Sequence, residues 1–287
     1  MPRLAYVNGR YLPHPHAMVH IEDRGYQFAD GVYEVVAIVN GRLADFDGHM
    51  ARLDRSLNEL RIARPMSPAA INAIIHHLIW QNRVGTGLLY IQITRGVAPR
   101  DFKFPSGTLR PSIVMTTRHV TAFSTPAQIE RGVAAITIPD IRWLRRDIKS
   151  VSLLPQVLGK QQAVEAGAYE AWMVDADGMV TEGCSSNAWI VTAEGTLVTR
   201  HADNLILNGI TRRSLLQIAE RLEIPVEIRA FSVSEARMAR EAFLSSASTF
   251  ALPITRLDGE PIGAGVPGPI TRRLRAAYLE TECTVTP

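Results

Sequence analysis

The chain has little cysteine and no long apolar run. Only two cysteines occur among its 287 residues, Cys184 and Cys283, and they are too few and too far apart for a disulfide framework or a paired-cysteine metal site. No apolar stretch approaches the roughly 20 residues that cross a membrane. The N-terminal residues carry no apolar segment with a small-residue cleavage site, so nothing marks the chain for export. We therefore expect two plain thiols and a cytoplasmic protein without a membrane partner.

The composition is that of an ordinary folded protein. Hydrophobic residues make up 46% of the chain and charged residues 21%, and the length is enough to bury roughly 70–75% of the unfolded surface in one large or two modest domains. A pI near 9.0 suggests nucleic-acid binding, but the net charge is only +3. A basic, non-catalytic RNA or DNA binder would need its arginines on one face. Because they are scattered among acidic residues, we expect no nucleic-acid partner.

Lysine is rare in this sequence. Of the 31 basic residues only three are lysines, namely Lys103, Lys149 and Lys160. Arginine cannot replace an amine that must lose its proton and attack a carbonyl. Lys149 ends a strand-like run and enters a polar turn beside Arg145 and Arg146, whose like charges disfavour the charged form of an amine. From composition alone the alternative for Lys149 is a surface basic cluster, and Lys160 is expected to be solvated.

Helix and strand periodicities predict an α+β protein with two α/β domains joined by a short linker. Residues 1–118 form the N-terminal domain, in which Asn-Gly pairs at Asn8 and Asn40 predict hairpins. Residues 119–130 have little apolar periodicity and are the linker. Residues 131–287 form the C-terminal domain, which carries Lys149.

Three helices are predicted with clear signals. The first spans about 49–62, and the second begins after the Ser67-Pro68 pair, which is a typical helix start. An amphipathic helix opens at Thr211, where apolar residues recur at helical spacing. Strands are predicted at 132–138, 169–174 and 226–231.

Two further stretches have the residue types that a cofactor site needs. Glu182 lies at a strand end before a glycine and small hydroxyl residues, where the backbone can approach a ligand. Gly209 and Thr211 stand where the amphipathic helix begins, so its free N–H groups and its dipole favour an anion. Each stretch alone is explained equally by a polar turn or a helix cap. Together with Lys149 they supply what pyridoxal phosphate requires, namely a Schiff-base amine, a partner for the pyridine nitrogen and an anion cradle.

Five motifs in order give the sequence a family resemblance that covers nearly the whole chain. It resembles the D-amino-acid aminotransferases of the fold-type IV pyridoxal-phosphate enzymes, a class that also holds branched-chain aminotransferases and aminodeoxychorismate lyase. The motifs lie at residues 22–34, 94–100, 140–150, 181–187 and 209–212. The resemblance implies pyridoxal 5′-phosphate as cofactor and a homodimer. It also implies ping-pong transfer of the amino group of a D-amino acid, such as D-alanine or D-glutamate, to pyruvate or 2-oxoglutarate.

The same resemblance implies the cofactor-binding residues. Lys149 corresponds to the catalytic lysine that holds the cofactor as a Schiff base and carries the transferred proton. Glu182 corresponds to the carboxylate that keeps the pyridine nitrogen protonated. The other implied contacts are with the phosphate, except for one apolar side chain against the ring: Arg52, Ile210, Thr211, Ser246 and Ala247 for the phosphate, and Leu207 for the ring. Ala247 stands where the family tends to have threonine, so any contact there comes from backbone N–H.

The substrate site is implied in the same way and contains a departure. Tyr33 and Arg100 correspond to members of the trap for the substrate carboxylate, with Arg100 expected from the other subunit, and Ser186 is a further implied substrate contact. The family usually has Ala-His-Gln-Phe after the arginine. This chain has Phe102 in place of the histidine and so lacks its hydrogen bond. Arg100 favours a carboxylate and Phe102 an apolar partner, so an R-selective amine transaminase or a branched-chain L-amino-acid enzyme remains the alternative.

His14, His16 and His20 are spaced as metal ligands can be. Two prolines beside them indicate a loop, and no acidic residue or cysteine accompanies them. We expect no metal site.

Overall fold

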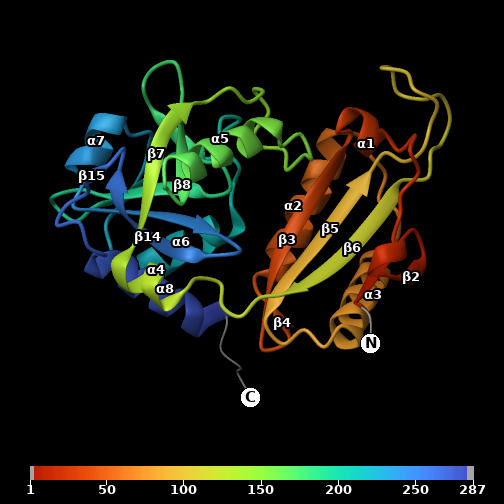
Figure 1. Cartoon of the computed structure of the whole chain (residues 1–287), viewed down its shortest axis with the longest axis horizontal. Helices are drawn as coiled ribbons and strands as arrows, with labels where there is room; N and C mark the ends of the chain where they lie inside the picture. Colours follow the sequence, from red (N-terminus) through yellow and green to blue (C-terminus); the bar gives the residue numbers. More distant parts are fainter. Residues whose placement is uncertain (1–2, 283–287) are drawn as a thin grey trace. The chain divides into compact units, whose positions relative to one another are not determined.

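The computed structural model describes residues 3–282, without the side chain of Glu282. The chain divides into two compact units (Figure 1). The first comprises Met1–Thr121 with Ile148–Ser152, and the second comprises Ala122–Asp147 with Leu153–Pro287. The segment that contains Lys149 therefore groups with the first unit, whereas the sequence analysis assigned it to the C-terminal domain. Cys283 lies outside the described residues.

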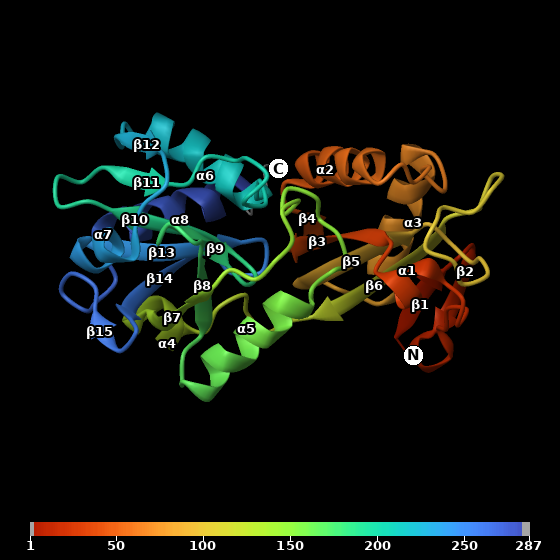
Figure 2. The same ribbon diagram turned by 90° about the horizontal axis from the view of Figure 1, so that it is seen from above.

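The first unit is an antiparallel sheet with helices on one face. Its described strands follow the order β2-β1-β6-β5-β3-β4, and α2 and α3 cover one side of it (Figure 2). Alternate strand residues form the core with the apolar faces of these helices, as period-2 patterning requires. The elements are β1 (Leu4–Val7), β2 (Arg10–Pro13), a 3-10 turn (His14–His16), α1 (Arg24–Phe28), β3 (Gly31–Val39), β4 (Arg42–Leu43), α2 (Phe46–Glu59), α3 (Pro68–Gln81), β5 (Gly87–Thr94) and β6 (Ser112–His119).

Local sequence signals account for several of these boundaries. Both Asn-Gly pairs make hairpin turns, and Asn8 and Asn40 have φ values of 47° and 51°, a conformation that asparagine and glycine tolerate. The Ser67 hydroxyl accepts a hydrogen bond from the N–H of Ala70 and caps α3. Helix α2 begins at Phe46, three residues before the predicted start, and ends at Glu59.

The Ile148–Ser152 segment pairs with the first strand residues of β3. The N–H of Tyr33 donates to the carbonyl of Lys149 at 3.0 Å, and the N–H of Val151 donates to the carbonyl of Gly31 at 3.0 Å. Ile148 is buried in the core of the first unit. One apolar side chain and two backbone hydrogen bonds therefore hold the backbone of Lys149 beside Tyr33.

The second unit is built on a mixed sheet. Its described strands follow the order β12-β11-β10-β13-β14-β7-β8-β9, with β15 paired to β14. Helix α5 packs on β7 and β8, whereas α6 and α8 pack on each other, α6 on β13 and α8 on both β13 and β14. The elements are α4 (Pro126–Arg131), β7 (Val133–Pro139), α5 (Leu154–Glu165), β8 (Glu170–Val174), β9 (Val180–Gly183), β10 (Asn187–Val191), β11 (Leu197–Thr199), α6 (Ile210–Arg221), β12 (Val226–Ile228), α7 (Val233–Met238), β13 (Glu241–Ser246), β14 (Phe250–Leu257), β15 (Glu260–Pro261) and α8 (Pro269–Glu282).

Two features of the second unit differ from the sequence-based expectation. The predicted linker contains α4, which Thr125 and Gln128 start with reciprocal side-chain hydrogen bonds. Strand β14 was not predicted, yet it pairs with both β13 and β7. Pro253 lies within it, and proline normally argues against an interior strand because it cannot donate a ladder hydrogen bond. In the described part of the chain, no helix combines the length and apolar character needed to span a membrane.

Candidate functional site

Lys149 differs from the other two lysines in its surroundings. Its Nζ lies 4.3 Å from the centre of the Tyr33 ring, and its backbone N–H donates to the Ser56 hydroxyl of α2 at 3.3 Å. Lys103 pairs with Asp101, and Lys160 pairs with Glu170, each at 3.4 Å. Within residues 3–282, Lys149 alone of the three has no carboxylate within ion-pair distance. Its amine is therefore the one available for chemistry.

Arg145 and Arg146 have acidic partners of their own. Arg145 pairs with Asp147 at 3.0 Å and Arg146 with Asp140 at 3.4 Å, all within the second unit. The structure therefore gives no support for the prediction that the charges of Arg145 and Arg146 act on the Lys149 amine. Lys149 is distinguished instead by the lack of a carboxylate partner among the described residues.

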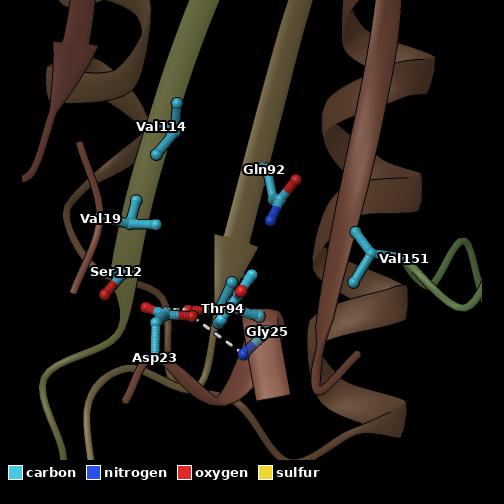
Figure 3. Close-up of a pocket in the computed structure, with 9 residues that line it drawn as sticks. Val19, Asp23, Gly25, Gln92, Thr94, Ser112, Val114 and Val151 are labelled. Carbon is cyan, nitrogen blue, oxygen red and sulfur yellow. Dashed lines mark hydrogen bonds between the residues drawn. The ribbon is translucent and has the colours of Figure 1, made fainter. Parts of the chain in front are cut away.

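A cavity opens on the face of the first sheet that α2 and α3 leave uncovered. Tyr33 stands opposite Gln92, and Gln92 stands opposite Val114 in the strand register, so the three side chains share this face. The Tyr90 hydroxyl donates to Gln92 at 2.6 Å. Figure 3 shows side chains that line this cavity. The volume of the cavity is about 310 Å³. The lining residues are Val19, Asp23, Gly25, Tyr26, Gln92, Thr94, Ser112, Val114 and Val151.

The cavity has a mixed lining on the same face as Tyr33. Valine side chains supply its apolar surface, and Gln92, Thr94 and Ser112 supply polar groups. Such a mixture suits a small molecule with both apolar and polar parts.

Arg52 belongs to a buried ionic cluster in the first unit. Its Nε and Nη2 donate to the two carboxylate oxygens of Glu34, each at 2.7 Å, and His49 Nδ1 lies 2.7 Å from the same carboxylate. Burial alone would raise the pKa of Glu34, but the guanidinium of Arg52 and the bonds of both partners lower it to about 2. Burial also lowers the pKa of His49. Glu34 thus fixes the direction of the arginine that the sequence predicts as a phosphate ligand.

Arg100 and Phe102 lie against the same aromatic ring. The Arg100 guanidinium is 4.7 Å from the centre of the Phe28 ring, and the Phe102 ring is 5.6 Å from it. Arg24 donates to the carbonyl of Asp101 at 2.7 Å and so holds the backbone between Arg100 and Phe102. Arg100 has no carboxylate partner among the described residues, and Phe102 is 85% exposed. This loop presents a cation beside an apolar surface.

Glu182 is a buried carboxylate in the second unit, surrounded by donors. Arg142 Nη1 donates to it at 2.5 Å, and Asn187 Nδ2 donates at 3.0 Å. The N–H of Leu207 lies 3.1 Å from both carboxylate oxygens. A carboxylate has about four lone-pair positions. Three donors therefore leave room for one more, such as a protonated pyridine nitrogen.

The charge of Glu182 depends on Arg142. Burial raises the pKa of the Glu182 carboxyl above its usual 4.5, and the Arg142 guanidinium opposes this rise. Pairing with Glu182 and Asp140 raises the pKa of Arg142 despite its burial. Asp140 accepts from Arg142 at 2.7 Å. Because every neighbour that bonds to Glu182 is a donor, the arrangement suits the ionised carboxylate.

The start of α6 is suited to an anion. Gly209 caps this twelve-residue helix without a side-chain hydrogen bond, so the first N–H groups have no capping acceptor. The Thr211 hydroxyl is buried and has no hydrogen-bond partner among the described residues. Buried polar groups without partners are rare. Thr211 and the helix dipole therefore fit a phosphate group.

Asn187 brings these parts of the second unit together. Its amide donates to Glu182 and, at 2.9 Å, to the carbonyl of Leu207. A Cβ on Gly209 would lie 2.0 Å from the side-chain oxygen of Asn187, so only glycine fits there. Asn187 also stands opposite Ser245 in the strand register, one residue before Ser246.

The remaining predicted residues have different surroundings. Ser246 is the last residue of β13, and Ala247 follows it in a turn. The Ser246 hydroxyl is 2.8 Å from that of Thr249. The Ser186 hydroxyl donates to Glu170 at 2.9 Å. Its predicted substrate contact stays a prediction, while the structure gives its hydroxyl a protein partner.

Arg142 and Asn187 were not assigned roles from the sequence. Both lie inside motifs that carry the resemblance, and a signal for each existed. A buried carboxylate needs a cation or several donors, so Glu182 required partners of these types. Arg142 is 40 positions away from Glu182, and single-sequence patterns do not show which arginine reaches it.

Known proteins resemble this chain over most of its length. The family model for amino-transferase class IV matches residues 31–257. D-alanine aminotransferase of Bacillus licheniformis is 42% identical over 275 residues, which is 94% of each chain. D-alanine aminotransferase of Staphylococcus aureus strain MSSA476 is 40% identical over 95% of each chain. A solved structure of the Escherichia coli branched-chain amino acid aminotransferase has a TM-score of 0.90 and 22% identity, covering 98% of this chain and 95% of that one.

Proposed function

This chain belongs to the class IV aminotransferases, and we propose that it moves the amino group of a D-amino acid to a 2-oxo acid. The cofactor is pyridoxal 5′-phosphate, and the cycle is ping-pong, with D-alanine or D-glutamate as donor and pyruvate or 2-oxoglutarate as acceptor. Two relatives at 40% identity or more that carry the name D-alanine aminotransferase support the choice of D-amino acids. A structure at 22% identity supports the fold alone, so the branched-chain alternative has less support.

The observation that carries the proposal is the available amine of Lys149. It is the one lysine in the described chain without a carboxylate partner, so its amine is not engaged in an ion pair. When bound, pyridoxal phosphate supplies an aldehyde that condenses with amines and a ring that takes up the electrons of a broken C–H bond. Lys149 would hold the cofactor through its amine and would carry the proton that leaves the substrate Cα.

Glu182 and the start of α6 hold the rest of the cofactor in this proposal. Glu182 accepts the N–H of the pyridine ring and keeps that nitrogen protonated, while Arg142 and Asn187 keep Glu182 in place. The N–H groups of Ile210 and Thr211 bind the phosphate with the Thr211 hydroxyl. Arg52 adds a positive charge. Leu207 packs against the ring, and the turn at Ser246 and Ala247 supplies backbone N–H groups.

The substrate carboxylate is bound by a trap that includes Arg100. Its guanidinium has no carboxylate partner in the described residues and is held over the Phe28 ring. Tyr33, beside the Lys149 amine, is a second member. Ser186 is a further substrate contact in this proposal.

A specific observation keeps R-amines as a second candidate substrate class. Phe102 is 85% exposed beside Arg100 and packs on Phe28 rather than forming a hydrogen bond. An apolar side chain in the trap favours a substrate group without a carboxylate.

We also propose that the protein is a cytoplasmic homodimer. Apolar side chains are exposed on α5 at Leu154, Val157 and Leu158, and on the first unit at Met18 and Ile21. Leu154, Val157 and Leu158 recur at helical spacing on one face of α5, and a contiguous apolar patch of this kind marks an association surface. A second copy of the chain would cover them and would bring its Arg100 to the site of the first.

A substrate panel tests the proposal. D-amino acids, L-amino acids and R-amines are assayed with pyruvate and with 2-oxoglutarate, and the cofactor absorbance is followed on adding each donor. We expect turnover and an absorbance change with D-alanine or D-glutamate. Turnover with R-amines alone, or with L-leucine alone, would replace the proposed substrate class.

A further inference from the structure

Glu170 is a buried carboxylate that the proposed reaction does not use. It is 0% exposed at the first position of β8. Its Oε2 accepts hydrogen bonds from the Ser185 and Ser186 hydroxyls at 3.0 and 2.9 Å. Its Oε1 accepts from the N–H of Ala171 at 3.1 Å. A buried carboxylate needs hydrogen-bond donors to offset its lost hydration, and two of the donors to Glu170 are serines of one turn.

Both serines lie in the tight turn that joins β9 to β10. Glu182 precedes this turn, and Asn187 follows it, so its conformation sets where Asn187 stands relative to the carboxylate it contacts. The N–H of Gly183 donates to the carbonyl of Ser186 at 2.7 Å. A Cβ on Gly183 would lie 2.4 Å from the Ser186 hydroxyl and 3.1 Å from Glu170 Cγ. The turn is therefore packed directly on Glu170.

Lys160 completes the cluster with a side chain that is 37% exposed, so the residue expected to be solvated also has protein partners. Its Nζ donates to the carbonyl of Tyr169, lies 3.4 Å from Glu170 and stands 4.4 Å from the centre of the Tyr169 ring. Its ammonium therefore meets a carbonyl, a carboxylate and a ring face together.

We propose that Glu170, neutralised by Lys160, is a positioning residue for the cofactor carboxylate: it holds Ser185 and Ser186, and thereby fixes the spacing of Glu182 and Asn187. The inference depends on the proposed role of Glu182 in binding the pyridine nitrogen. Glu170 touches neither substrate nor cofactor in this account. It affects catalysis by fixing the conformation of the turn between β9 and β10.

Three variants separate this role from general stability. Glu170→Ala removes the acceptor of both hydroxyls. Glu170→Gln keeps one carbonyl oxygen for the serines and removes the charge, so it is the conservative rescue. Glu165→Gln is the matched control, because Glu165 lies on α5 and bonds only to Gln161 among the described residues.

The first readout uses cofactor-free protein. Hydrogen exchange is measured for the peptide that covers residues 180–187, and Glu170→Ala is expected to speed it by about tenfold or more, since each hydrogen bond to a charged group contributes enough for roughly that factor. Glu170→Gln should stay within about threefold of wild type. Peptides of the first unit should not change in any variant.

The second readout uses the holoenzyme without substrate. In Glu170→Ala, the pH at which the cofactor absorbance changes should move, because Glu182 and Asn187 no longer keep their spacing around the pyridine nitrogen. The D-alanine kcat should fall about tenfold with KM nearly unchanged. Glu165→Gln should match wild type in all three measurements.

The results bear separately on the two proposals. If Glu170→Ala matches the Glu165→Gln control in exchange and in the absorbance titration, the positioning role is overturned. If wild type does not turn over D-alanine, the proposed function fails, while exchange and titration still decide the role of Glu170. Should Glu170→Ala not fold, Ser186→Ala removes one of the two hydroxyl bonds and is expected to change both readouts in the same direction by at least threefold; no change would overturn the proposal.

Discussion

Replacing Glu182 with glutamine tests the electrostatic part of the site. The carboxylate accepts from Arg142, Asn187 and Leu207, and a glutamine keeps the shape but only one acceptor oxygen. Its NH₂ group must then face either Arg142 or Asn187, both of which are donors. One buried donor is left without an acceptor, which costs about 1–3 kcal/mol of folding stability.

The effect of Glu182→Gln on turnover is expected to exceed its effect on substrate binding. A hydrogen bond to a charged group contributes about 1.5–3 kcal/mol, and the bond from Glu182 would keep the pyridine nitrogen protonated so that the ring can accept electrons. At 1.36 kcal/mol for each factor of ten, kcat should fall about 10- to 150-fold. The KM for D-alanine should change less, because the trap residues are untouched.

The assay compares Glu182→Gln and Glu182→Asp with wild type and with the exposed control Glu165→Gln. Turnover of D-alanine with 2-oxoglutarate gives kcat and KM, and circular dichroism reports the fold. The aspartate retains the charge on a shorter side chain and should fall between wild type and the glutamine variant. A Glu182→Gln enzyme with kcat within twofold of wild type would remove the carboxylate from the mechanism.

Three further predictions concern the first unit. Losing one partner of a desolvated charge pair costs about 2–5 kcal/mol, so Arg100→Leu should lower kcat/KM for D-alanine about 30- to several-thousand-fold and affect an R-amine far less; equal losses for both substrates would make Arg100 structural. Phe102→His, which restores a donor, should raise the D-alanine to R-amine ratio, and an unchanged ratio would mean that Phe102 points away from the substrate. Glu34 has a pKa of about 2 in the folded chain against 4.5 unfolded, so it stabilises the fold fully above about pH 4.5 and loses this contribution, about 3 kcal/mol, as pH falls toward 2. Urea unfolding between pH 6 and 3 should show a smaller pH dependence for Glu34→Gln than for wild type; parallel curves would contradict the ionic role of Glu34.

Local signals made much of the fold predictable. The Asn8-Gly9 and Asn40-Gly41 turns and the Ser67 cap act within a few residues, and the structure has the two hairpins and α3 where these signals lie. Strand β14 could not be predicted in this way. Its place between β13 and β7 depends on pairing with segments far along the chain, and Pro253 gives the opposite local signal.

The site residues likewise differ in whether local sequence signals identify them. Lysine scarcity, a carboxylate at a strand end and a glycine before a helix are local features, and they led to Lys149, Glu182 and Thr211. Arg142 could not be identified as a partner of Glu182, because it reaches the carboxylate from 40 positions away in the sequence. Lys160 shows the same limit, since the sequence alone did not reveal that the fold brings Glu170 to its amine.

Borohydride reduction tests whether Lys149 carries the cofactor. The holoenzyme is reduced with borohydride, which makes a Schiff-base linkage permanent, and is then digested for peptide mass mapping. We expect the mass of the reduced cofactor on the peptide that contains Lys149. In Lys149→Ala, the corresponding peptide should lack this added mass. Finding the modification on Lys103 or Lys160 of the wild-type enzyme would contradict this role of Lys149.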